Sequence, residues 1–431
     1  MKKALSLCGL LVAGTALATN GMNLIGYGAY SALLGGGRMG NANPTAMVGN
    51  PALLAEITDP MLCTSLTLLM PSLTYTDHVP MGMGMPGEGA VMNDKVEGEA
   101  AVFPLPYVGY ARPVGERMVV GVCGYAQGGM GVDFKDLNTA FGTQDDIYSN
   151  VAYMRVTGGF AYKAGPRSAV GLSLSMGYAM LDFKYFPSTV IDMNGDMVPE
   201  FNGMDVEGLT SFGYNAKLGF SSRALDDRLN WGAWFGTKAA VDFDNGTLTF
   251  AAPMPDGSNG FDARFKDFSW PAEVGAGFSF KLTPRVTVLS DLVHYSWRDA
   301  VDEPALQTDV PMINSMLPAF QMHWKNRLAA SAGCQWQLNE KTALLAGFNH
   351  GASPVPSHLL NALFPATTED HLSVGARHRM GDWGVTGGVE YAFNAKQTNS
   401  TPDDGTDYFG MTNTTIEHSQ LSLHLGLSKS F

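Results

Sequence analysis

The chain has 431 residues, of which 45% are hydrophobic, 16% are charged and 51 are glycines, and its formal net charge at pH 7 is −13. This acidic balance argues against a nucleic-acid partner, which would require clustered basic side chains. After the N-terminal segment, no stretch approaches the roughly 18 consecutive apolar residues that a membrane helix needs. A membrane protein built without helices has to be a closed β-barrel, because lipid cannot satisfy an open sheet edge.

The first residues predict an export signal. Lys2 and Lys3 precede an apolar run over residues 4–17, and Ala16-Leu17-Ala18 supplies small residues at the two positions that a signal peptidase reads. The pattern is typical of a secretory signal peptide over residues 1–18, with the mature chain starting at Thr19. The alternative is a transmembrane helix, for which about 14 apolar residues are too few.

Residues 19–60 are rich in glycine and have little period-two pattern. We expect them to form a hatch, or plug, inside the lumen, because a large barrel encloses space that side chains alone do not fill. The alternative is a disordered periplasmic tail. Such a tail would not carry this many apolar groups: Leu24, Ile25, Tyr27, Tyr30, Leu33, Leu34, Leu53, Leu54 and Ile57.

From residue 61 onward one pattern repeats: an alternating run, a short turn, a second run and a long polar connection. In residues 170–178, for example, Val, Leu, Leu, Met and Tyr alternate with Gly and Ser. About fourteen such runs are present, and the long connections fall near residues 77–99, 129–148, 182–210, 244–266, 297–322, 350–368 and 394–418. Short and long connections in alternation are typical of outer-membrane barrels. The sequence therefore predicts an all-β, 14-stranded antiparallel transmembrane barrel over residues 61–431.

The last eleven residues support export to the outer membrane. Residues 421, 423, 425 and 427 are all leucine, and small polar side chains lie between them, as in a strand with lipid on one face. The chain ends on Phe431, which resembles the terminal signal that barrel assembly machinery reads. Lys429 departs from that pattern, although near the interface it can snorkel. The alternative is an edge strand of a soluble β-sandwich.

Several segments, in order, resemble the FadL-type family of outer-membrane transport proteins. The most specific lie in the predicted hatch, and others lie along the barrel: residues 20–21 (NG), 26–28 (GYG), 31 (S), 35–40 (GGGRMG), Asn50-Pro51-Ala52, 106–111 (PYVGYA), 212–215 (FGYN), 231–237 (WGAWFGT), 270–272 (WPA), 291–297 and 324–326 (WKN). The resemblance implies a monomeric, plugged fourteen-stranded barrel in outer-membrane lipid and lipopolysaccharide. It also implies passive diffusion of long-chain fatty acids or aromatic hydrocarbons through a groove, an inner pocket and a lateral opening.

Two external segments are candidates for ligand capture. Met81, Met83 and Met85 lie in one long connection, and Met316 and Phe320 lie in the apolar stretch 306–320. Flexible, polarizable side chains suit varied hydrophobic ligands, and we expect residues 306–320 to form a helix over the barrel mouth. Plain loop packing is an equal alternative for the methionines, and methionine spacing of this kind can also bind soft copper.

A fatty-acid carboxylate inside the barrel would need a cation. Strand parity points Arg155, Lys217, Lys325 and Arg327 into the lumen. The alternative role for each is pairing with a lumen acid such as Glu273, Asp291 or Glu390.

The third predicted strand contains Gly121, Gly124, Gly128 and Gly129. Glycine inside a strand often marks a bulge or kink, and the FadL-type resemblance places the lateral opening here. Continuous pairing on both sides of this strand would exclude an exit at that place.

The sequence shows no nucleophile–base arrangement, phosphate loop or metal-ligand spacing, so we expect neither an enzyme nor a cofactor. Cys63, Cys123 and Cys334 lie in strand-like runs and read as small apolar residues rather than a disulfide framework. The alternative functions are a general diffusion porin, which would need an open lumen and no hatch, and a surface barrel protein that transports nothing.

Overall fold

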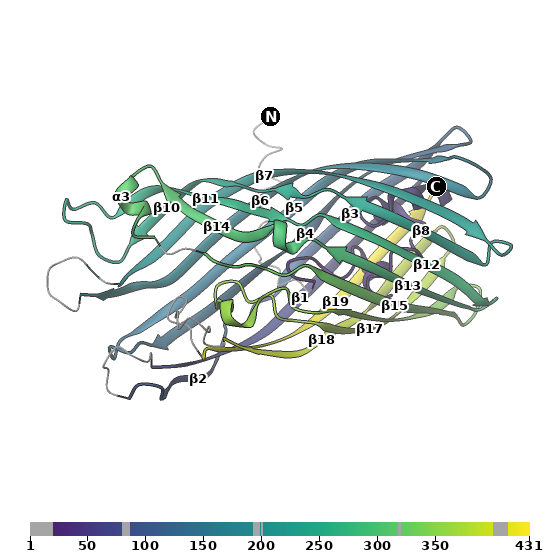
Figure 1. Cartoon of the computed structure of the whole chain (residues 1–431). Helices are drawn as coiled ribbons and strands as arrows, with labels where there is room; N and C mark the ends of the chain where they lie inside the picture. The colour runs from purple at the N-terminus through teal and green to yellow at the C-terminus, as the bar shows by residue number, and fades with distance from the viewer. Residues whose placement is uncertain (1–19, 80–86, 193–198, 200, 318–319, 400–412) are drawn as a thin grey trace.

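The computed structural model describes residues 20–79, 87–192, 199, 201–317, 320–399 and 413–431. Within these residues the chain forms a closed antiparallel barrel, which confirms the predicted fold (Figure 1). Its fourteen wall strands follow one another around the barrel, and β1 pairs with β19 to close it. The wall strands are β1 Met61–His78, β3 Phe103–Val114, β4 Met118–Asn138, β5 Gln144–Lys163, β6 Ser168–Ile191, β7 Phe201–Ala224, β8 Leu229–Gly236, β12 Glu273–Thr283, β13 Val286–Tyr295, β15 Arg327–Gln337, β16 Thr342–Gly351, β17 Asp370–Met380, β18 Trp383–Thr398 and β19 Thr415–Ser430.

Shorter elements extend this wall or fill it. Further strands are β2 Val91–Glu97, β9 Ala239–Ala240, β10 Phe243–Phe250, β11 Gly260–Trp270 and β14 Val301–Thr308. The helical turns are α2 Ala29–Ala32, η1 Pro44–Met47, η2 Pro51–Glu56, η3 Trp297–Asp299, α3 Pro311–Asn314 and η4 Ser357–Leu359. In the part of the chain that the structure describes, no helix combines the length and the apolar character needed to span a membrane.

The wall strands alternate because they separate two environments. On β6, Leu174 and Met176 are 59% and 49% exposed on the outer face. Further along the same strand, Leu181, Phe183 and Tyr185 are buried on the inner face. Successive side chains of a strand point to opposite faces, so apolar residues at every second position keep one face of the strand apolar.

Four of the predicted long loops are wrong in kind. Residues 129–138 and 144–148 extend β4 and β5, residues 182–191 and 201–210 extend β6 and β7, and β10, β11 and β14 occupy much of 244–266 and 297–322. These extensions turn charged side chains outward, such as Asp182, Lys184 and Asp205, beyond the apolar belt of the barrel. In these extensions the outer residues are charged and the inner residues are apolar. This reverses the lipid-facing pattern that identifies the other strands in the sequence, so the sequence predicts loops there.

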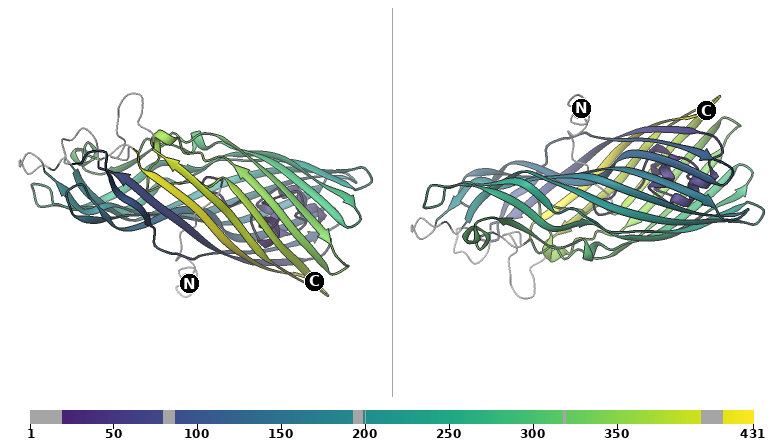
Figure 2. Two further views of the ribbon diagram at one scale, coloured as in Figure 1. Left: turned by 90° about the horizontal axis from the view of Figure 1, so that it is seen from below. Right: turned by 90° about the horizontal axis from the view of Figure 1, so that it is seen from above.

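Residues 20–57 lie inside the barrel, toward the end that carries the C-terminus (Figures 1 and 2). Leu33, Leu34, Leu53 and Leu54 are all fully buried there. We call residues 20–57 the hatch. β1 starts at Met61, and the predicted boundary between hatch and barrel at residue 60 stays a prediction. The predicted signal peptide lies outside the described residues and stays a prediction.

Candidate functional site

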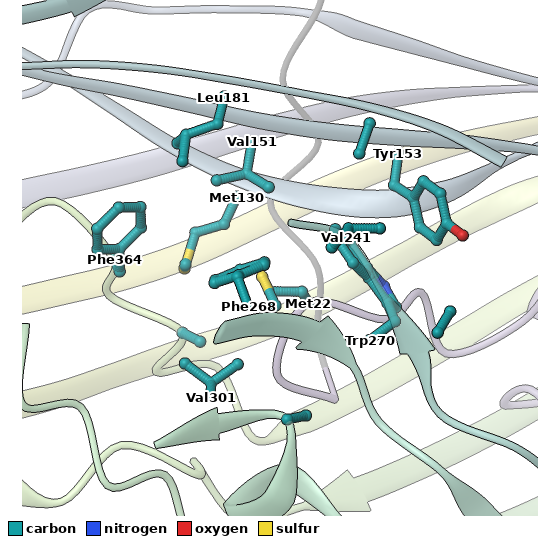
Figure 3. Close-up of a cluster of buried hydrophobic side chains, with 14 of the residues drawn as sticks. Met22, Met130, Val151, Tyr153, Leu181, Val241, Phe268, Trp270, Val301 and Phe364 are labelled. Carbon is teal, nitrogen blue, oxygen red and sulfur yellow. The ribbon is translucent and has the colours of Figure 1, made fainter. Parts of the chain in front are cut away.

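A cluster of buried apolar side chains fills the lumen next to the hatch and includes Met22 of the hatch itself, and Figure 3 shows its members gathered from facing strands. It is built from the hatch, β4, β5, β6, the connection between β9 and β10, β11, β14 and the connection after η4. We call it the apolar chamber and define it by ten residues: Met22, Met130, Val151, Tyr153, Leu181, Val241, Phe268, Trp270, Val301 and Phe364. The chamber places hydrocarbon across the interior of a barrel whose outside is also apolar.

Phe320 belongs to this interior rather than to an external groove. It is 1% exposed, and its ring lies 5.3 Å from that of Phe265 and 5.7 Å from that of Phe183. Met316 is 41% exposed and follows α3, which spans only four residues. The predicted helix over 306–320 is therefore wrong in length, since its first residues belong to β14. Met81, Met83 and Met85 lie outside the described residues.

Lys217 is held in an ion network that ties the hatch to the wall. Its Nζ lies 2.6 Å from Glu273 Oε1 and donates to the carbonyl oxygen of Val48 in the hatch. Arg38 of the hatch reaches the same Glu273 carboxylate at 2.5 Å and donates to the Tyr295 hydroxyl at 3.0 Å. Lys217 thus pairs with the lumen acid Glu273, which was the alternative to a role in binding a ligand.

Arg38 is the member of this network that the sequence did not single out. Its guanidinium lies over the Trp234 ring, 5.0 Å from the centroid, and its backbone N–H donates to the Asp291 carboxylate. Burial alone would lower the pKa of the Arg38 guanidinium, but the neighbouring Glu273 carboxylate outweighs this and raises it. The Arg38 guanidinium therefore keeps its positive charge despite its burial.

Arg155 has a different environment from Lys217. It is 9% exposed and lies over the Tyr153 ring, 4.6 Å from the centroid. Among the described residues no carboxylate lies within ion-pairing distance of it, and its Nε has no hydrogen-bond partner. A buried cation without an acid is costly unless another group satisfies it.

Lys325 is exposed and lies in the segment before β15, outside the strand. Its backbone N–H donates to the carbonyl oxygen of Pro354. The parity argument that pointed Lys325 into the lumen is therefore wrong, because parity holds only within a strand. Arg327, the first residue of β15, is half-buried and donates its Nε to the Ser353 carbonyl oxygen.

Asn50, Pro51 and Ala52 attach the hatch to the wall at close range. The Asn50 side chain accepts from the Ala52 N–H at 3.1 Å, capping η2, and donates to the Phe220 carbonyl oxygen of β7 at 2.9 Å. A Cβ added at Gly232 would lie 2.8 Å from the Asn50 Nδ2 atom, and one at Gly219 would lie 2.9 Å from Pro51 Cδ. The wall glycines opposite this motif leave the space that it occupies.

The predicted lateral-opening glycines divide into two groups. Gly121 and Gly124 pair with β3 on one side and β5 on the other. The β3–β4 ladder ends at Tyr107–Tyr125, so Gly128 and Gly129 lie beyond it and pair with β5 only, after a bulge. On the open side, Gly128 forms a bridge with Asn23 of the hatch, and the Gln127 side chain donates to Asn23 Oδ1 at 2.7 Å.

A small cavity of about 20 Å³ lies beside this break, lined by Gln127, Arg155, Lys217, Trp270 and hatch residues including Tyr27. That volume holds about one water molecule. The cavity brings together two of the predicted ligand-binding cations, Arg155 and Lys217. It also connects the break in the wall with the apolar chamber, since Gln127 at the break and Trp270 of the chamber both line it.

Sequence reasoning also missed a polar cluster on β17 to β19. The Glu390 carboxylate lies between His371 Nδ1 and His424 Nε2, at 3.1 Å from each. Among the described residues no group of His, Cys, Asp and Glu is arranged to hold a metal ion.

Comparisons with known proteins agree with this architecture. The family model described as outer membrane protein transport protein (OMPP1/FadL/TodX) matches residues 10–431. The solved structure of the Pseudomonas putida toluene transporter TodX is similar with a TM-score of 0.73 at 18% identity, covering 95% of this chain and 99% of that one. A Pseudomonas aeruginosa FadL homologue gives a TM-score of 0.72 at 14% identity, covering 97% and 100%.

The Ralstonia pickettii toluene transporter TbuX gives a TM-score of 0.70 at 17% identity, covering 95% of this chain and 99% of that one. No curated protein sequence matches the chain. The structural matches show the shared fold, and the family match extends over nearly the whole sequence. This barrel is therefore an outer-membrane transport protein for hydrophobic compounds rather than an enzyme, and the chain belongs to the OMPP1/FadL/TodX family.

Proposed function

We propose that the protein takes up long-chain fatty acids or aromatic hydrocarbons across the outer membrane by passive diffusion. In this proposal the ligand enters the apolar chamber from outside, the hatch blocks water and ions, and the ligand leaves sideways through the wall. The observation that carries the proposal is the apolar chamber itself, where Phe268 and Trp270 are each 1% exposed.

The energetics favour a hydrophobic cargo. An apolar molecule gains roughly 0.8 kcal/mol for each methylene that moves from water into an apolar site. A water-filled pore gives no such gain, and the described lumen is filled by side chains instead. This supports a hydrophobic route over a general diffusion porin.

Arg155 supports a cargo with an acidic head. Its guanidinium has no carboxylate partner among the described residues and borders the cavity beside the wall break. A carboxylate placed there would satisfy the Nε that is otherwise unpartnered. Lys217 is the less suitable cation, because Glu273 already neutralises it.

We place the exit where the β3–β4 ladder ends, at Gly128 and Gly129. Asn23 and Gln127 cover this edge, so a ligand leaving here breaks the hydrogen bond between their side chains and the bridge from Asn23 to Gly128. Gly128 has a φ of 144°, a backbone conformation that side chains rarely adopt, so it suits a place where the strand must bend.

The test compares uptake of radiolabelled oleate and toluene into cells that carry the wild type, Val301→Trp or Val310→Trp. Val301 is fully buried in the chamber, whereas Val310 is 38% exposed before α3 and serves as the control. We expect Val301→Trp to lower uptake of both ligands at least tenfold and Val310→Trp to leave uptake unchanged. Sugar flux through the wild type, or full uptake by Val301→Trp, would refute the hydrophobic route.

The same assay separates the two cargo classes. Arg155→Gln removes the charge while keeping a polar side chain of similar reach. If the head group binds here, oleate uptake falls by roughly ten- to a hundredfold and toluene uptake does not change, since one charge-assisted hydrogen bond contributes roughly 1.5–3 kcal/mol. An equal effect on both ligands would mean that Arg155 has only a structural role.

A further inference from the structure

A second break in the barrel wall lies on the opposite side of the β4–β7 sheet. The strand that begins as β8 leaves the wall after Gly236 and returns to it as β10 at Phe243. Between them, β9 pairs with β11 and not with β7. A Cβ added at Gly213 of β7 would lie 2.8 Å from Val241 Cγ1 and 3.1 Å from the Ala240 carbonyl oxygen. Residues 240–241 therefore cross the inner side of β7.

The edge of β7 is left without a strand partner where this crossing takes place. Pairing with β8 ends at Lys217–Gly236, where the Thr237 N–H still donates to the Ala216 carbonyl oxygen at 2.9 Å. Pairing resumes with β10 at Thr210–Asp244. Across residues 211–215, all of which are described, β7 has a strand partner only on the β6 side.

This break faces lipid. Phe212 and Tyr214 are 59% and 64% exposed on the outer face, next to the exposed Tyr178 of β6. A membrane protein tolerates unpaired backbone at this depth only where it is buried in protein or lines a cavity. The interrupted ladder in the apolar belt therefore indicates that a group other than a neighbouring strand hydrogen-bonds the backbone N–H and C=O groups of β7 there.

The cavity beside Arg155 reaches this second break. Asn215, Thr237 and Pro271 line it from the β7–β8 side, while Gln127 lines it from the β3–β4 side. Trp270 also lines it, and its Nε1, in a side chain only 1% exposed, has no hydrogen-bond partner among the described residues. A buried donor of this kind points to a ligand or water that is present when the protein works.

One rung of the sheet connects the two breaks. Arg155 of β5 pairs with Tyr125 of β4, the last residue before the first break, and with Gly177 of β6. Gly177 pairs in turn with Gly213 of β7, inside the second break. Both breaks therefore lie on one rung of hydrogen-bonded neighbours, and the cavity is lined from both of them.

We propose that the gap between β7 and the β8–β10 strand is a second lateral opening, through which neutral hydrophobic molecules pass between the lumen and the membrane. The inference rests on the proposed function and extends it: one chamber serves two exits. Phe212 and Tyr214 cover the lipid side of the gap, and Trp270 offers its indole N–H to a weakly polar group or a π-face on the lumen side. Arg155 lies at the centre, between the two exits.

Site-directed labelling from the lipid phase tests the opening. In a Cys63→Ala, Cys123→Ala, Cys334→Ala background, Asn215→Cys places a thiol inside the second break. Ser331→Cys is the control, because Ser331 also lies on the inner face, where it is buried and Asn215 is half-buried, but β15 is paired on both sides of it. The protein is reconstituted in liposomes and treated with pyrene maleimide dissolved in the bilayer, or with a charged, water-soluble maleimide.

We expect pyrene maleimide to label Asn215→Cys at least tenfold faster than Ser331→Cys, and faster than the charged reagent labels it. Equal rates at the two positions, or equal rates with the two reagents at Asn215→Cys, would overturn the proposal, because access would then come through the lumen. Liposome uptake of toluene by each protein is measured in parallel. Uptake that persists while Asn215→Cys stays unreactive refutes only the second opening, whereas absence of uptake by the wild type refutes the proposed function.

Blocking completes the test. A pyrene group attached at Asn215→Cys lowers toluene uptake in part, one attached at Gln127→Cys lowers it in part, and both together lower it further than either alone. If the label at Gln127→Cys alone removes all toluene uptake, no toluene passes through the β7 gap and the proposal fails.

Discussion

Arg38→Met tests whether the buried ion network holds the hatch in place. The substitution keeps the aliphatic stem of the side chain and removes the guanidinium that contacts Glu273 and Tyr295. Glu273 then keeps one ion-pair partner, Lys217, in place of two. Asp291 keeps its hydrogen bond from the backbone N–H of residue 38 but loses the neighbouring guanidinium, so that one buried negative charge is left without compensation.

The expected cost follows from that uncompensated charge. Breaking a buried ion pair by removing one partner costs about 3–5 kcal/mol. Because about 1.4 kcal/mol corresponds to a tenfold change in an equilibrium constant, the equilibrium between the docked and released hatch shifts by roughly two to three and a half powers of ten. The hatch carries this loss alone, since the wall strands around Glu273 keep their ladders with β8 and β13.

Amide hydrogen exchange of residues 20–57 measures this equilibrium directly, because exchange there requires release from the wall. We expect exchange in Arg38→Met to accelerate by the factor above. Arg264→Met is the control: Arg264 pairs with Asp309 at 2.8 Å, but both side chains are exposed, and such pairs contribute about 0–1 kcal/mol. If Arg38→Met accelerates hatch exchange by less than fivefold, or no more than Arg264→Met does, the network does not hold the hatch.

Three further predictions concern the hatch. Asn50→Ala removes a helix cap and the hydrogen bond to the Phe220 carbonyl oxygen of the wall, for a cost of roughly 2–3 kcal/mol in hydrogen-exchange stability of the hatch. Asn43→Ala removes a cap and a hydrogen bond from the Thr45 hydroxyl but no wall contact, and it should cost about 1 kcal/mol; equal costs would contradict the role of the wall contact. Deletion of residues 20–55 should give steady ion conductance in planar bilayers and abolish the selective uptake of oleate over sugars, whereas a porin would conduct as before. Burial raises the pKa of Glu56, so the docked hatch binds this proton more tightly than the released hatch and loses stability as the pH rises above the usual carboxyl range. Glu56→Gln should remove that part of the pH dependence of hydrogen exchange in residues 51–57. Parallel pH profiles of the wild type and Glu56→Gln would contradict this prediction.

The parts of the fold that could be predicted are those that repeat. Alternation in β6, with glycine and serine opposite leucine and methionine, indicated a strand between lipid and a crowded lumen, and the count of such runs gave fourteen strands. Glycine at Gly128 also indicated a bulge, and the register of β4 with β5 shifts between Ala126 and Gly128. These features depend on neighbours in the sequence, which a pattern records.

The parts that could not be predicted depend on residues far apart in the sequence. Arg38 and Glu273 are separated by 235 positions, and nothing near Arg38 in its glycine-rich segment indicates a carboxylate partner. The same limitation explains Lys217, whose partner could be offered only as an alternative. The second wall break was missed for another reason: residues 237–242 carry no glycine or bulge signal, and only the pairing of β9 with β11 reveals that they leave the wall.

The outward extension of the strands restricts where foreign sequence can be inserted. β6 has 24 residues, so it is roughly 80 Å long at about 3.3 Å per residue, and its inner face stays apolar after its outer face turns from leucine to charge. A one-residue insertion in Leu181–Tyr185 would exchange those two faces just as it would within the membrane. Peptide tags for surface display are therefore tolerated only at the tips that no ladder crosses, such as the short turn between Asn138 and Gln144.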